Sequence, residues 1–217
     1  MRTFVFIVLS CITSSVLAQT HDDHTVLSII NYLFLPKGIV EGYQLRDDIL
    51  SKDYSLLPSG TKENDRQRFD AIYEDAFFQC KGDVKASMLA SLLAVFEHKT
   101  IPVNFFGGRI DIPLSLESSE RFDERVKRLP IYLYHDGVAD GDKSQHFFMS
   151  AYLKRVLGSG LLVKALGELV ELGEDIFIIG GANDRRDVVA NIDGIRFAIV
   201  ASVDSVSSPS KMLSPNP

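Results

Sequence analysis

The feature that most constrains this fold is a set of polar residues embedded in the apolar, helix-like last third of the 217-residue chain. They come in pairs spaced three or four residues apart: Asp142 with His146, Glu168 with Glu171, and Asp187 with Asn191. Side chains at these spacings lie on the same face of an α-helix. Polar groups among apolar neighbours need hydrogen-bond or ionic partners once they are buried. We therefore expect three helices between residues 142 and 203 that turn these groups towards a common centre.

Apolar residues recur at helical spacing through most of the chain, which predicts a mainly α protein. The expected helices cover residues 26–35, 62–80, 83–96, 117–129, 142–157, 161–179 and 184–203. The exception is residues 101–114, where two short apolar stretches flank Gly107-Gly108-Arg109. A glycine turn between two such stretches is typical of a β-hairpin, and the prolines in them favour an edge position. The predicted fold is a helical bundle with a small β-hairpin around residues 101–114.

Residues 1–18 have the pattern of a signal peptide, with a basic start at Arg2 and an apolar core from Phe4 to Ile12. The core is too short for a permanent membrane span, so we expect no spanning helix after cleavage before Gln19. The alternative is a retained N-terminal anchor. We expect residues 19–204 to form a single helical domain, with an N-terminal part over 26–135 and the polar motifs over 142–203. The tail, 205–217, is rich in serine and proline, which predicts disorder.

The acidic balance of the chain restricts its partners. The formal net charge is −6 at pH 7, and no basic stripe is present to displace counterions from a nucleic acid. Nucleic acids and anionic membrane surfaces are therefore not expected partners. A signal peptide directs the chain out of the cytoplasm, so we expect it in the periplasm or outer envelope of a bacterium. There it would meet envelope components or another envelope protein.

The polar set supports two kinds of chemistry. His146, beside Asp142 on one helix face, could act as a general base in acid–base catalysis. Alternatively, one imidazole and several carboxylates are the ligands that a divalent metal such as Zn, Mn, Fe or Mg accepts. The candidate metal ligands are His146, Glu168, Glu171 and Asp187.

A structural interpretation competes with both. Asp142 can cap its own helix, and a histidine beside Phe147 can be a hydrogen-bonded core residue. The glutamates can form a solvated acidic face or pair with Arg185 and Arg186. Ala190, Gly194 and Ala198 recur every four residues, and such small side chains allow a second helix to approach closely. Under this interpretation a structural cluster of Asp142, His146, Glu171, Asp187 and Asn191 holds three helices in register.

The same residues carry a resemblance to known families. The run Asp142-Lys143-Ser144-Gln145-His146-Phe147, a glutamate-bearing segment, and then Asp187, Ala190-Asn191 and Gly194 resemble the YfiM-like periplasmic lipoproteins, which have no assigned reaction. The skeleton is also similar to that of VanZ-like proteins, which are linked to glycopeptide resistance. The resemblance covers Asp142 to Val200, and it implies an envelope location rather than a particular activity.

Two functional hypotheses follow. The first is an exported envelope protein with a binding or structural role. The second is a metal-assisted or acid–base hydrolase that acts on a cell-wall or lipid component. No HExxH, GxSxG or phosphate-binding glycine loop is present in the sequence, so we favour the first hypothesis.

Overall fold

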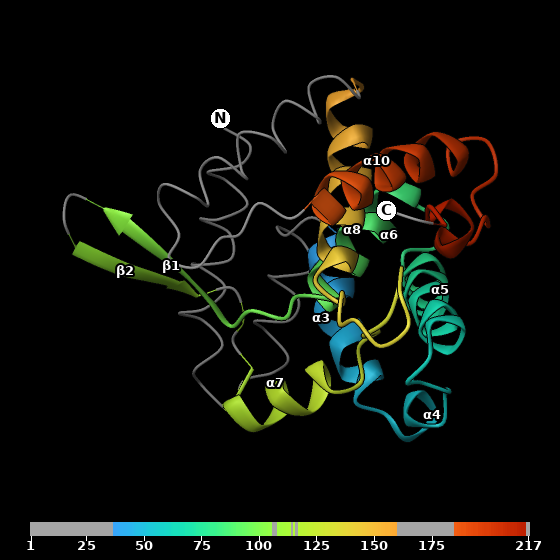
Figure 1. Cartoon of the computed structure of the whole chain (residues 1–217). Helices are drawn as coiled ribbons and strands as arrows, with labels where there is room; N and C mark the ends of the chain where they lie inside the picture. Colours follow the sequence, from blue (N-terminus) through green and yellow to red (C-terminus); the bar gives the residue numbers. More distant parts are fainter. Residues whose placement is uncertain (1–36, 106–107, 114, 116, 160–184, 216–217) are drawn as a thin grey trace.

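The computed structural model describes residues 37–105, 108–113, 115, 117–159 and 185–215. This part of the chain is mainly α, as predicted: it contains seven α-helices and a short 3₁₀ helix (Figure 1). The predicted signal peptide and the predicted helices over 26–35 and 161–179 lie outside the described residues. No helix that the structure describes is both long and apolar enough to cross a bilayer.

The first described helices, α3 (Lys37–Ile49) and α4 (Lys52–Ser55), fall in a stretch where the sequence predicts no helix. The reason is that α3 contains Gly38 and Gly42, and glycine disfavours helices in isolation. Both glycines face α6. A Cβ on Gly38 would lie 2.6 Å from the Ala86 carbonyl oxygen, and one on Gly42 would lie 3.0 Å from Leu93 Cβ. Packing of α3 against α6 therefore requires glycine at these two positions, although glycine lowers the helix propensity of α3.

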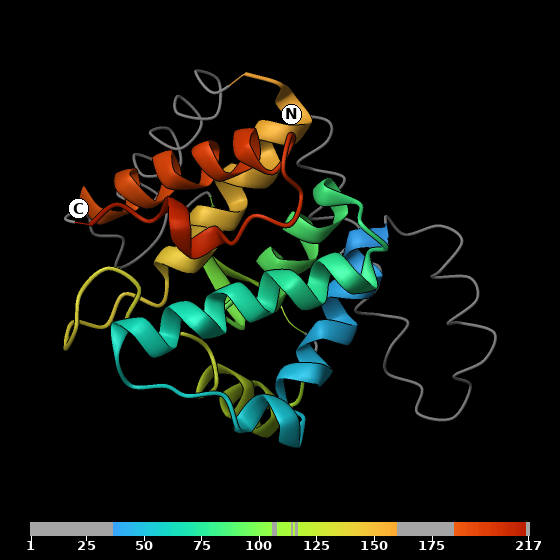
Figure 2. The ribbon, with the colours of Figure 1, turned by 90° about the vertical axis from the view of Figure 1, so that its right-hand side faces the viewer.

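Helices α5 (Lys62–Gln79) and α6 (Val84–Ala94) begin where the sequence predicts. The Thr61 side chain accepts from Asn64 N–H, and the Asp83 side chain accepts from Ala86 N–H. Both residues thus satisfy backbone donors that a helix leaves unpaired at its start. In Figure 2 the long helix α5 runs across the middle of the molecule, with α10 above it.

Two strands and a short helix follow α6. Strands β1 (Thr100–Phe105) and β2 (Gly108–Pro113) pair antiparallel, with Thr100 opposite Pro113 and Phe105 opposite Gly108. Figure 1 shows this pair extending away from the helices. Helix α7 (Ser119–Val126) then leads back to the helical core, into which Phe122 is buried.

Two fully buried arginines anchor the segment between β2 and α7. Arg46 donates to the Leu93 carbonyl oxygen, and Arg125 donates to the Ala94 carbonyl oxygen, both at the end of α6. Glu117 forms an ion pair of 2.8 Å with Arg125 and lies 3.6 Å from Arg46. The guanidinium groups therefore satisfy the carbonyls that α6 leaves unpaired at its end. Burial raises the pKa of the Glu117 carboxyl, whereas Arg125 and Arg46 lower it. The arginines have the larger effect together, so the pKa lies below its usual value.

Helices α8 (Lys143–Leu157) and α10 (Arg185–Val200) pack side by side above α5 and α6 (Figure 2). Their contact uses the predicted small-residue face of α10, because Ala190, Gly194 and Ala198 are all buried. A Cβ on Gly194 would lie 2.9 Å from the Phe147 carbonyl carbon and closer still to its oxygen. The close approach that the sequence predicts for this face is therefore confirmed.

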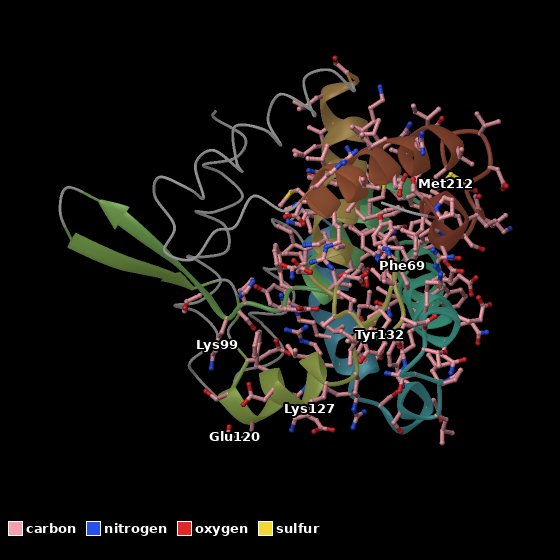
Figure 3. The ribbon with its side chains drawn as sticks, viewed as in Figure 1. Phe69, Lys99, Glu120, Lys127, Tyr132 and Met212 are labelled. Atoms are coloured by element: carbon pink, nitrogen blue, oxygen red, sulfur yellow. The ribbon has the colours of Figure 1, made fainter. Side chains whose placement is uncertain are left out.

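An aromatic cluster beneath α8 and α10 joins them to α5. It consists of Phe69, Tyr73, Phe147, Phe148 and Phe197, whose neighbouring ring centroids lie 4.8 to 6.5 Å apart. Phe69 lies in the densely packed interior in Figure 3, whereas Lys99, Glu120 and Lys127 lie at the margin near α7. The cluster fixes α8 and α10 on a common base, so polar side chains between these two helices are held at defined distances.

The predicted disorder of the tail is wrong for residues 205–215. Pro209–Met212 form a 3₁₀ helix, and Leu213 is only 7% exposed. Asp70 of α5 and Asp193 of α10 accept hydrogen bonds from Ser210 and Ser214. Composition alone predicts disorder because it registers serine and proline but not partners supplied by distant helices.

Candidate functional site

The candidate site begins at the first turn of α8. Asp142 occupies the N-cap position, but its backbone is already helical (φ −56°, ψ −26°), and its side chain makes no capping hydrogen bond. The prediction that Asp142 caps its helix is therefore wrong. Its carboxylate turns instead towards Lys143, whose Nζ lies 2.6 Å from Asp142 Oδ2. The Asp142 side chain remains 45% exposed, so it forms the outer edge of the site.

Lys143 is the centre of the arrangement. It is only 2% exposed, and its Nζ lies 2.6 Å from Asp187 Oδ1 as well as 2.6 Å from Asp142 Oδ2. Burial lowers the pKa of this ammonium, but the hydrogen bonds and charges of the two carboxylates outweigh burial and raise it. Lys143 is therefore a permanent cation between α8 and α10. No spacing in the sequence singles out Lys143, although it stands inside the motif between Asp142 and His146.

His146 lies beside Asp187 rather than being held by Asp142. Its Nε2 is 3.4 Å from Asp187 Oδ1, and its imidazole is 23% exposed. The two residues come from different helices, so this contact adds a second polar link between α8 and α10. Their shared helix face predicts a pairing of His146 with Asp142, but the Asp142 carboxylate contacts Lys143 instead.

One turn further along, Asn191 completes the polar contacts between the helices. Its Oδ1 accepts a hydrogen bond of 2.7 Å from Ser150 Oγ. The structure therefore brings together four of the predicted residues, Asp142, His146, Asp187 and Asn191. We call these four residues, with Lys143 and Ser150, the seam cluster, because they line the contact between α8 and α10.

Glu97 lies next to this cluster, although the sequence gives no signal for it. A Cβ on Gly141 would lie 2.5 Å from Glu97 Oε1, so the carboxyl group packs against the backbone just before Asp142. Burial and the nearby Asp142 raise the pKa of Glu97 from 4.5 to about 7, while Arg125 and Lys143 act in the opposite direction. Only the folded chain brings Glu97 and Asp142 together, which is why no sequence spacing indicates the contact.

The remaining candidates, Glu168 and Glu171, lie outside the described residues. Within the parts of the chain that the structure describes, no group of three or more His, Cys, Asp or Glu side chains is placed to hold a metal ion. Asp187, one predicted ligand, is already paired with the Lys143 ammonium at 2.6 Å. A divalent metal site with His146 and Asp187 would have to displace this internal cation, and it stays a prediction that depends on the two glutamates.

A surface hollow of about 490 Å³ lies at the end of α5. Phe77, Phe78 and Gly82 contribute to its lining, which includes no residue of the seam cluster. Comparison with known protein families, with curated proteins and with solved structures found no match to this chain.

Proposed function

We propose that this chain is an exported protein of the bacterial cell envelope with a binding or structural role. In this proposal a helical bundle with a hairpin around residues 101–114 forms its single domain, and the seam cluster holds the C-terminal helices together. The observation that carries the proposal is Lys143, a buried ammonium shared by Asp142 and Asp187. A buried carboxylate needs hydrogen-bond donors or a compensating cation, and for Asp187 this chain supplies the cation itself.

Asp187, the acid of the seam cluster that lies on α10, is thereby used in holding α8 against α10. Asp187 contacts Lys143 and His146, both on α8, and Asn191 accepts from Ser150 on the same helix. Every one of these contacts crosses between two helices. Polar contacts with this distribution support a role in helix register, and Glu171 would extend the same role to a third helix.

Removal of one carboxylate tests the structural part of the proposal. Asp187→Ala should lower the free energy of unfolding by about 1–3 kcal/mol, because Lys143 then loses one of its two carboxylates while still buried. Asp204→Ala is a matched control, since Asp204 is exposed just beyond the end of α10. Equal urea-unfolding curves for the two variants would contradict the structural role.

The envelope location rests on the signal-peptide pattern of residues 1–18 and on the resemblance of residues 142–200 to periplasmic lipoproteins. Expression of the full chain in a Gram-negative bacterium, followed by fractionation, tests it directly. The mature protein should leave the cytoplasm, and mass spectrometry should find an N-terminus at Gln19. Recovery of the intact chain from the cytoplasmic fraction would refute the proposed location.

An acid–base or metal-assisted hydrolase acting on a cell-wall or lipid component is the second candidate. Two observations favour it: the partly exposed His146 imidazole lies beside Asp187, and the pKa of Glu97 is raised to about 7. A carboxyl group such as that of Glu97, which exchanges its proton near neutral pH, suits general acid–base catalysis.

His146→Ala distinguishes the two candidates, because it should abolish hydrolysis of such substrates without loss of fold if the enzyme hypothesis is right. Elemental analysis of protein purified without a histidine tag tests the metal-assisted form. Stoichiometric zinc, manganese or iron would favour that form over the structural role.

A further inference from the structure

The C-terminal segment 205–214 crosses two helices that lie far apart in the sequence. After α10 the chain turns back and runs along that helix towards its start (Figure 2). Tyr73 of α5 donates a hydrogen bond of 3.4 Å to the Ser205 carbonyl oxygen at the turn. Leu213 is buried in the apolar core, with Met212 packed beside it (Figure 3). We call this segment the C-terminal strap.

Two aspartates hold the strap in the same way. Asp70 of α5 accepts from Ser210 N–H at 2.8 Å and from Ser210 Oγ at 2.6 Å. Asp193 of α10 accepts from Ser214 N–H at 2.8 Å and from Ser214 Oγ at 2.9 Å. Asp193 has no exposed surface, so separation of Ser214 would remove two donors from a fully buried carboxylate. Arg196 Nη1 and Tyr134 Oη would still donate to Asp193, but a buried carboxylate that loses two of its donors is costly, and this cost favours the closed strap.

Asp193 connects the strap to the loop before α8. Its Oδ2 accepts from Ser214 N–H and also from Tyr134 Oη, the latter at 3.2 Å. Burial, followed by the charge of Asp193, raises the pKa of Tyr134, so its hydroxyl keeps the proton that it donates. Tyr134 and Ser214 therefore share one carboxylate, and a shift of either changes the position available to the other.

The loop in turn connects to the seam cluster. The Tyr134 N–H donates a hydrogen bond of 3.1 Å to Asp140 Oδ2. The carbonyl oxygen of Asp140 in turn accepts a hydrogen bond of 3.0 Å from the backbone N–H of Lys143. Asp140 is fully buried and also accepts a hydrogen bond from the Leu133 N–H. Hydrogen bonds to Asp140 therefore fix both ends of the loop between Leu133 and α8. A continuous series of hydrogen bonds thus runs from Ser214 through Asp193, Tyr134 and Asp140 to Lys143.

We propose that the C-terminal strap is a latch whose closure on Asp193 sets the position of the Tyr134 loop and, through it, of Lys143 in the seam cluster. The inference rests on the structural role proposed above for that cluster. Coupling of this kind requires an element with two arrangements. The contacts at Asp193 and those at Lys143 must each stabilise one of these arrangements more than the other. The strap supplies that element, because a short segment joined to the helices by a few side-chain hydrogen bonds and two apolar residues opens at lower free energy than the helical core.

Ser214→Ala tests the latch, with Ser202→Ala as the matched control. Ser202 is an exposed serine near the start of the strap, and its Oγ donates to the Ile199 carbonyl oxygen rather than to an aspartate. Hydrogen exchange of amides 210–214 should become about fivefold faster in Ser214→Ala, as expected for one lost hydrogen bond, and should not change in Ser202→Ala. Equal exchange in both variants would overturn the latch.

The link to the seam cluster needs a second readout, the imidazole Cε1–H resonance of His146 in two-dimensional NMR. This resonance should move in Ser214→Ala, and the movement should disappear when Tyr134→Phe is combined with it. If Tyr134→Phe fails to fold, urea below the global transition opens the strap in the wild-type chain, and His146 should then move in parallel with strap exchange. Faster strap exchange with an unmoved His146 resonance would overturn the coupling. An Asp187→Ala variant as stable as the wild type would instead refute the structural role. The two strap measurements are made without that variant, so the two failures can be told apart.

Discussion

Replacement of Glu97 by glutamine should make the protein more stable at neutral pH. Burial and the Asp142 carboxylate raise the pKa of Glu97 to about 7 in the folded state, from 4.5 for an unperturbed group. The folded state therefore binds a proton more tightly than the unfolded state does. Between pH 4.5 and 7 the folded chain holds more protons, so the wild type loses stability as the pH rises through this window.

The size of the effect follows from the shift. Each pKa unit corresponds to about 1.4 kcal/mol, so a change from 4.5 to about 7 corresponds to roughly 3 kcal/mol. Glu97 is only partly buried, and solvent screening should reduce the measured effect to about 2 kcal/mol. Glutamine has the shape of the protonated acid and never ionises. Glu97→Gln should therefore match the wild type near pH 4.5 and exceed its stability by about 2 kcal/mol at pH 8.

Urea unfolding at pH 4.5, 6 and 8 measures this difference. The chain contains no tryptophan and seven tyrosines, so far-ultraviolet circular dichroism is the better probe. Asp123→Asn on the exposed surface of α7 serves as the control and should leave the pH profile unchanged. A Glu97→Gln profile parallel to that of the wild type, or a loss of stability at pH 8, would refute the reasoning.

Two further substitutions test the contact between α8 and α10. Lys143→Met leaves Asp187 buried without its cation and should cost about 3 kcal/mol, which calorimetry should record as a fall in Tm of roughly 6–12 °C. Lys154→Met near the end of the same helix is its control and should cost less than about 1 kcal/mol. Gly194→Ala should destabilise by about 1–3 kcal/mol in urea, because its Cβ would overlap the Phe147 carbonyl. Helix propensity alone predicts a gain of about 1 kcal/mol for Gly194→Ala, so the sign of the change decides between packing and propensity.

Local sequence signals predicted the helices whose determinants are themselves local. Thr61 and Asp83 accept backbone hydrogen bonds within their own first turns, and both helix starts follow from residue type and position. The buried face of Ala190, Gly194 and Ala198 could be predicted in the same way, because the three residues recur every four positions within one helix.

Features determined by distant partners were missed. Gly38 and Gly42 lower the helix propensity of α3, and only contact with α6 explains why both are there. Ser210 and Ser214 are ordered by aspartates of α5 and α10, which composition does not register. In each case the stabilising group lies outside the residue's own element, where neither periodicity nor capping rules apply.

Lys143 shows which part of the candidate site local spacing indicates and which part it does not. Spacing places Asp142 and His146 on one helix face, and polar groups among apolar neighbours need hydrogen-bond or ionic partners, for which a divalent metal is one candidate. A lysine next to an aspartate ordinarily lies on the surface, because its ammonium is strongly hydrated. Here the first turn of α8 buries the lysine, and Asp187 reaches it from another helix at 2.6 Å. The compensating charge is therefore internal, and this favours the assignment of the seam cluster to holding α8 and α10 together.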